Sequence, residues 1–151
     1  MGLTIRIGLT GLPVVSEAAT TAMLMPCPNI SMAARQIAET LDLPAIICWT
    51  SSGSTAFRVA RERPKPPIVA ITPNVAAGRK LSVVWGVHCV VAEDAHDLDD
   101  MVSRAGSIAF RDGFVRAGQR VLIVAGVPLG IPGTTNMVRI ASVGPDGDAN
   151  M

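Results

Sequence analysis

Residues 45–63 read AIICWTSSGSTAFRVARER, and this stretch decides the fold. The apolar run 45–49 is too short for a helix and rich enough in isoleucine to be a buried strand. A turn of threonine, serine and glycine follows, and a helical pattern begins at about Thr55. The stretch therefore predicts a strand, a loop lined by hydroxyl groups and a helix N-terminus in direct succession.

The loop between this strand and this helix, residues 50–55, is called the hydroxyl loop. A helix N-terminus carries backbone N–H groups without acceptors and a partial positive charge, which together favour a phosphate. Gly53 allows close approach of the main chain or a positive φ. A simpler interpretation is that Ser52 or Ser54 only caps the helix. The candidate phosphate-binding residues are Thr50, Ser51, Ser52, Gly53, Ser54 and Thr55.

The composition predicts one domain with a hydrophobic core, since the chain has 151 residues of which 49% are hydrophobic. Only 17% are charged, which predicts that part of the surface is covered by a partner. The apolar runs are too short to cross a bilayer, so we expect no membrane segment. A net charge of +1 and an aromatic content of 3% argue against nucleic acid as a ligand.

The cysteines Cys27, Cys48 and Cys89 are odd in number and have no CxxC spacing. Buried thiols are ordinary in strands, and two of these residues fall in predicted strands. We therefore expect a reducing compartment. Because the N-terminus carries no recognisable targeting signal, the expected location is the cytoplasm.

Helical and strand patterns alternate along the chain after residue 29. Further strands are predicted at 68–71, 87–92, 121–125 and 137–143, and further helices at 30–41, at 74–81 and before Gly113. Strands that are apolar on both faces predict a parallel sheet with helices on each side, a three-layer, doubly wound α/β fold. Residues 1–29 are expected to form an arm or linker, 30–144 the domain and 145–151 a tail.

A second loop, residues 126–136, follows the predicted strand 121–125 and is rich in glycine, proline and hydroxyl groups. It is here called the glycine-rich loop. Ligands of such sheets bind at the carboxyl ends of the strands, where both loops are expected to lie. The two loops could therefore close on one anion.

Four motifs together resemble the C-terminal domain of pyruvate kinase. They are the hydroxyl loop with Ala56, Arg63-Pro64 with Pro67-Ile68, Trp85-Gly86-Val87, and Gly126 with Gly133-Thr134-Thr135-Asn136. Their order and spacing agree with that family over residues 30–143. The resemblance implies five strands with the last one antiparallel. It also implies a regulatory and assembly role in a tetrameric glycolytic enzyme that converts phosphoenolpyruvate and ADP to pyruvate and ATP.

The resemblance also implies an effector site. In relatives regulated by fructose bisphosphate, one phosphate binds the loop that matches the hydroxyl loop. The loop that matches the glycine-rich loop covers the sugar. Ser51 replaces a lysine of some relatives, and Met101 falls where an arginine holds the second phosphate. The implied effector-loop residues are Gly126, Gly130, Gly133, Thr134 and Thr135.

The catalytic lysine and the magnesium and potassium ligands of the family belong to a (β/α)₈ barrel that has no counterpart in these residues. The resemblance therefore implies no catalysis, metal or cofactor for this chain alone. The implied partners are a phosphorylated effector, further copies of the chain and a pyruvate kinase barrel.

Two other functions remain open. One is a stand-alone protein that binds a phosphorylated metabolite. The other is a serine hydrolase with Ser52 or Ser54 as nucleophile, His88 or His96 as base and an aspartate from 94–100, although the first glycine of G-x-S-x-G is missing. Nucleotide-binding sites are not indicated, because neither G-x-x-x-x-G-K-[ST] nor G-x-G-x-x-G occurs.

The predicted helix before Gly113 starts with a cluster of carboxylates. They are Glu93, Asp94, Asp97, Asp99 and Asp100. A metal site is one interpretation, but the spacing matches no calcium loop, and acidic residues favour a helix N-terminus through its dipole.

Overall fold

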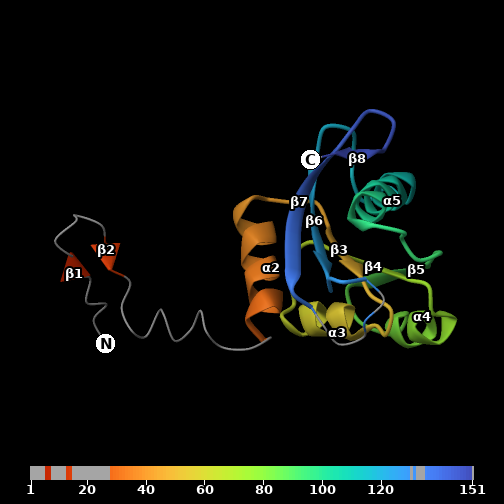
Figure 1. Cartoon of the computed structure of the whole chain (residues 1–151), viewed down its shortest axis with the longest axis horizontal. Helices are drawn as coiled ribbons and strands as arrows, with labels where there is room; N and C mark the ends of the chain where they lie inside the picture. Colours follow the sequence, from red (N-terminus) through yellow and green to blue (C-terminus); the bar gives the residue numbers. More distant parts are fainter. Residues whose placement is uncertain (1–5, 8–12, 15–27, 130, 132–134, 151) are drawn as a thin grey trace.

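The computed structural model describes residues 6–7, 13–14, 28–129, 131 and 135–150 (Figure 1). The main sheet consists of β3 (Ile46–Trp49), β4 (Ile68–Thr72), β5 (Val87–Val91), β6 (Arg120–Ala125), β7 (Met137–Val143) and β8 (Ala149–Asn150). The helices are α2 (Pro28–Thr40), α3 (Ser54–Arg61), α4 (Val75–Leu81) and α5 (Leu98–Arg111). In a separate antiparallel pair, β1 (Arg6–Ile7) lies beside β2 (Pro13–Val14). Among the described helices, none is long and apolar enough to cross a membrane.

The strand order of the main sheet is β5-β4-β3-β6-β7-β8. Strands β5, β4, β3 and β6 are parallel, whereas β7 runs antiparallel to β6. Every residue of β3 and β4 is buried, as expected of parallel strands that are covered on both faces. The predicted α/β fold is therefore confirmed, and the strand predicted at 137–143 is antiparallel as expected, whereas β8 adds a sixth strand to the predicted five.

The two faces of the sheet carry separate hydrophobic clusters. On β3, Ile47 and Trp49 belong to the cluster that α5 covers, whereas Ile46 and Cys48 belong to the cluster that α2, α3 and α4 cover. Figure 1 shows α2 and α5 on opposite sides of the sheet. Alternate residues of one short strand thus hold the layers together, and β3 lies between β4 and β6 at the centre of the sheet.

The ends of the domain differ from the sequence prediction. Helix α2 begins at Pro28, inside the predicted arm, because proline is tolerated in the first turn of a helix, where its missing N–H is not needed. At the other end, β8 lies inside the predicted tail and pairs with β7. Gly106 of α5 makes room for this strand, since a Cβ atom at Gly106 would collide with Ala149.

The acidic cluster stabilises the start of α5. Asp97 is its N-cap and accepts a hydrogen bond from Asp100 N at 2.8 Å. The Asp100 carboxylate in turn accepts from His96 N at 3.0 Å and from Arg104 Nε at 2.8 Å. The His96 N–H, and then Arg104, hold the pKa of Asp100 below its ordinary value. The predicted role at a helix N-terminus is confirmed, and no metal-binding group of three or more ligands forms among the described residues.

Candidate functional site

The hydroxyl loop connects the end of β3 to the start of α3, at the carboxyl edge of the parallel strands. Thr50 is 5% exposed, and its backbone N–H donates to Ile71 O at 3.0 Å. The Thr50 hydroxyl accepts from Gly53 N at 3.0 Å, which closes the loop into a tight turn. From β4, Thr72 Oγ1 donates to Ser51 O at 3.3 Å. Hydrogen bonds to β4 and a hydrogen bond within the loop therefore hold the loop backbone in place.

Helix α3 begins without a side-chain cap. Its N-cap residue is Gly53, in the left-handed region at φ 88°, and no side chain accepts a capping hydrogen bond. The predicted cap by Ser52 or Ser54 is therefore wrong. Ser52 Oγ instead accepts a long bond of 3.4 Å from Ser54 N and donates to Ser54 Oγ at 3.1 Å. Because Gly53 has no side chain to cap the helix, this long bond is the one side-chain hydrogen bond to the N-terminus of α3 among the described residues.

The hydroxyl loop and the glycine-rich loop meet through two threonines. Thr55 Oγ1 and Thr135 Oγ1 are 2.9 Å apart and share a buried hydrogen bond. The ends of the glycine-rich loop are closed by Asn136, whose side chain exchanges two hydrogen bonds of 2.7 Å with the backbone of Val127. The predicted proximity of the two loops is thus confirmed at this contact. Gly126 follows β6 and is half-buried, whereas Gly130, Gly133 and Thr134 lie outside the described residues.

Met101, for which the resemblance implies an arginine in some relatives, is completely buried in the cluster between α5 and the sheet. Its side chain is part of the core. Met101 therefore provides no positive charge for a second phosphate.

The residues of the hydrolase alternative are not brought together in the described part of the chain. His88 lies in β5 and is paired with Asp112, with 3.2 Å between His88 Nε2 and Asp112 Oδ2. Its ring also packs against Phe114. His96 contributes its backbone N–H to Asp100. Neither histidine forms a hydrogen bond with Ser52 or Ser54, so the described residues hold no serine–histidine pair.

The two cysteines of the described sheet fit a packing role. Cys48 is completely buried, and burial raises the pKa of its thiol to about 12. Cys89 is half-buried, and burial also raises its thiol pKa. Both thiols are therefore protonated near neutral pH and are weak nucleophiles.

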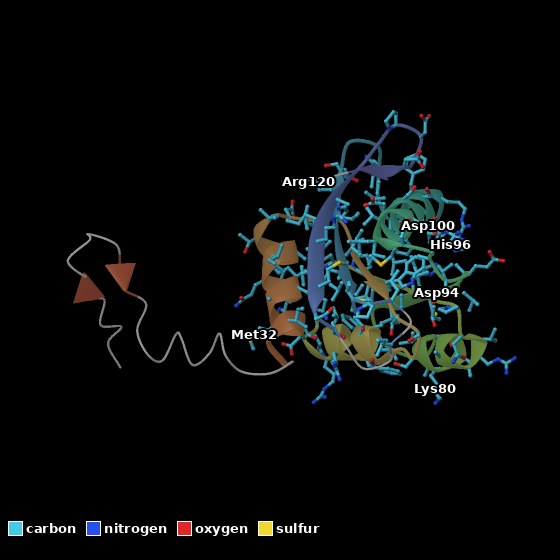
Figure 2. All side chains as sticks on the ribbon, in the orientation of Figure 1. Met32, Lys80, Asp94, His96, Asp100 and Arg120 are labelled. Atoms are coloured by element: carbon cyan, nitrogen blue, oxygen red, sulfur yellow. The ribbon has the colours of Figure 1, made fainter. Side chains whose placement is uncertain are left out.

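Two features near the site were not predicted. Trp49 Nε1 donates to Asp94 Oδ1 at 3.1 Å, which ties the residue before the hydroxyl loop to the segment after β5 (Asp94 is labelled in Figure 2). Arg58 of α3 has a buried Nη1 atom without a hydrogen-bond partner. Neither feature follows from a local sequence pattern, because each depends on how the folded chain packs.

Comparisons with known proteins agree with this architecture. A family model described as the alpha/beta domain of pyruvate kinase matches residues 28–141. Over 114 residues the chain is 54% identical to a pyruvate kinase of Methylorubrum extorquens, covering 76% of this chain and 24% of that protein. The identity to a pyruvate kinase of Clostridium acetobutylicum is 39% over 114 residues, with the same coverage of 76% and 24%. For pyruvate kinase 2 of Synechocystis it is 39% over 132 residues, covering 87% of this chain and 22% of that protein. The chain thus spans about a quarter of the length of the curated relatives that it matches.

Proposed function

Because the chain belongs to the family of the pyruvate kinase alpha/beta domain, we propose that it is a regulatory and assembly domain that binds a phosphorylated effector at the hydroxyl loop. The effector is a small metabolite with one recognised phosphate, such as a sugar phosphate or a nucleoside monophosphate. We expect phosphate transfer by the relatives named pyruvate kinase to require the three quarters of their length that this chain does not match.

The uncapped N-terminus of α3 carries this proposal. Gly53 has no side chain that could cap the helix, and among the described side chains the first N–H groups of α3 have only the long bond from Ser54 N to Ser52 Oγ. The exposed Ser52 and the half-buried Ser54 place hydroxyl groups beside these N–H groups. Hydrogen bonds to a phosphate oxygen and the helix dipole contribute about 0.5 to 3 kcal/mol each. These contributions are local, so the loop is suited to a single phosphate group.

We expect a bisphosphate to gain little over a monophosphate, because Met101 supplies no second cation. Calorimetric titration of the chain with fructose 6-phosphate and with fructose 1,6-bisphosphate should give similar dissociation constants, and fructose should not bind. If the bisphosphate binds about tenfold tighter or more, which corresponds to about 1.4 kcal/mol, the single-phosphate account is wrong. If neither phosphate ester binds better than fructose, the effector site itself is refuted.

We also propose that the chain associates with other protein surfaces, either further copies of itself or a pyruvate kinase barrel. Between α4 and β5, Val83 is 85% exposed and Trp85 is 69% exposed. The guanidinium of Arg63 lies 5.5 Å from the Trp85 ring centroid. Neighbouring exposed apolar and aromatic side chains are typical of protein interfaces. The low charged fraction of 17% also favours an interface.

Self-association is expected to depend on this apolar turn. The wild-type chain should sediment as a dimer or larger at high micromolar concentration, and the double variant Val83→Ser, Trp85→Ser should dissociate more readily. Val75→Ser is the matched control, because Val75 is 53% exposed at the other end of α4. A wild-type chain that remains monomeric would contradict self-association, and equal effects of both variants would contradict the assignment of the surface.

A further inference from the structure

An open hollow lies between the end of α3 and the turn that connects α4 to β5, and it is here called the arginine hollow. Its volume is about 360 Å³, and its lining residues are Phe57, Ala60, Arg61, Arg63, Val84 and Trp85. Sites for small molecules begin at about 300 Å³ and combine apolar walls with a few polar or charged groups. The arginine hollow meets this description, and none of its lining residues belongs to the hydroxyl loop.

The two arginines of the hollow have no carboxylate partners. Arg61 and Arg63 are both exposed, and neither takes part in an ion pair among the described residues. The guanidinium of Arg63 lies 5.5 Å from the centroid of the Trp85 ring, within the range of a cation–π contact. A guanidinium has five N–H donors and stays charged at any ordinary pH. The hollow therefore combines an aromatic surface with positive charge that is available to an anion.

The backbone of Arg63 has a conformation that an arginine rarely adopts. Its φ is 49°, in the left-handed region, at the residue that follows the C-cap Glu62 of α3. Glycine is the usual residue at this position, because a Cβ atom makes the conformation strained. Asp42 has the same φ, but aspartate tolerates this region better than most residues. Since strained residues gather at ligand sites, an arginine in place of glycine favours a function for its side chain.

Trp85 gives the hollow a flat apolar wall. Its side chain is 69% exposed, so it contributes little to the core of the domain. Large exposed apolar side chains mark binding surfaces more often than isolated small ones do. Both an indole ring and a guanidinium plane can stack on a flat aromatic ring. The surface of this hollow is thus suited to a planar ligand.

We propose that the arginine hollow is a second ligand site, which binds a planar aromatic compound that carries an anionic group. The ring stacks against Trp85, and the guanidinium groups of Arg61 and Arg63 bind the anionic group through charge-assisted hydrogen bonds. Nucleotides and aromatic carboxylic acids share this chemistry. The site is independent of the proposed effector site, because the two have no residue in common.

Calorimetric titration of the whole chain with two matched pairs of compounds tests the proposal. Adenosine 5′-monophosphate and adenosine differ in the anionic group, and the first should bind about 10- to 100-fold tighter. Benzoate and cyclohexanecarboxylate differ in the flat ring, and benzoate should bind about 3- to 10-fold tighter. A preference in one pair alone assigns the site to nucleotides or to aromatic acids, respectively. No preference in either pair would overturn the proposal.

The variant Ser52→Asp separates this site from the hydroxyl loop. It is expected to lose phosphate binding at that loop, and Ser52 does not line the arginine hollow. Adenosine 5′-monophosphate should therefore bind Ser52→Asp as tightly as it binds the wild type. Loss of its binding in this variant would place the nucleotide at the hydroxyl loop and overturn the nucleotide assignment of the hollow. Failure of fructose 6-phosphate to bind the wild type would instead overturn the proposed function alone.

Substitutions in the hollow locate the ligand. Arg63→Gln should weaken binding of the preferred aromatic anion about 10-fold or more, since it removes a charge-assisted contact. Trp85→Leu should weaken it about 3- to 10-fold, because the flat wall is lost. Arg79→Gln is the matched control, since Arg79 is exposed in the last turn of α4 and does not line the hollow. Val83→Ser changes the proposed association surface without changing the lining, so it should also bind like the wild type.

The variant Arg63→Gly separates a ligand role of Arg63 from a structural one. Glycine adopts a positive φ without strain, so the unfolding temperature should be equal to that of the wild type or higher, while ligand affinity falls. A lower unfolding temperature together with the lower affinity would assign Arg63 a structural role and overturn its role as a ligand. Affinity equal to the wild type in both Arg63→Gln and Trp85→Leu would overturn the site itself.

Discussion

Replacement of Ile47 by alanine is expected to lower the free energy of unfolding by about 2–5 kcal/mol. Ile47 is fully buried in β3 and belongs to the cluster that α5 covers. It pairs with β4 on one side and with β6 on the other, so the lost methyl groups leave a cavity at the centre of the sheet. Because the surrounding strands can relax only in part, the cavity adds to the lost transfer free energy. Equilibrium unfolding in urea measures the change.

Ile140→Ala is the control for this prediction. Ile140 is also an isoleucine in a strand, but it lies in β7 and is 39% exposed. Its replacement should cost much less, and Ile47→Val should cost only about 0.5–1.5 kcal/mol. Similar losses for Ile47→Ala and Ile140→Ala would contradict the central position assigned to β3.

Most strands could be predicted because their signal is local. The segment 137–143 coincides with β7, and the run 121–125 misses only Arg120 of β6. Their apolar runs end at glycine, proline or polar residues, so the sequence marks both strand and boundary. The start of the helix predicted at 74–81 also agrees with the structure, where Asn74 is the N-cap of α4 and accepts hydrogen bonds from Ala76 N and Ala77 N.

The ends of the domain could not be predicted in this way. Strand β8 has two residues and exists because it pairs with β7 and packs on α5, which no local pattern records. The one available signal was Gly106, since a glycine within a helix often marks a close approach of another chain segment.

The position of the candidate site could be predicted from the sequence, but its detailed geometry could not. The strand–loop–helix pattern located the hydroxyl loop, yet the cap was assigned to the wrong residues because Gly53 takes a left-handed conformation and the Thr50 side chain closes the turn. The contact of Thr55 with Thr135 spans 80 residues.

Replacement of Ser52 by aspartate is expected to abolish phosphate binding. Ser52 is exposed at the mouth of the hydroxyl loop, so the substitution should leave the fold intact. Two unit charges about 4 Å apart repel by about 1 to 4 kcal/mol in surroundings between bulk water and the protein surface, and a phosphate dianion doubles this energy. The expected loss of affinity is therefore about 30-fold or more.

Asparagine at the same position is the matched control, because it has nearly the shape of aspartate without the charge. Calorimetric titration with fructose 6-phosphate of the wild type, Ser52→Asn and Ser52→Asp tests the phosphate site most directly. The account predicts phosphate-dependent binding to the first two proteins and none to Ser52→Asp. Equal affinity of Ser52→Asp and the wild type, or no phosphate-dependent binding by the wild type, would contradict it.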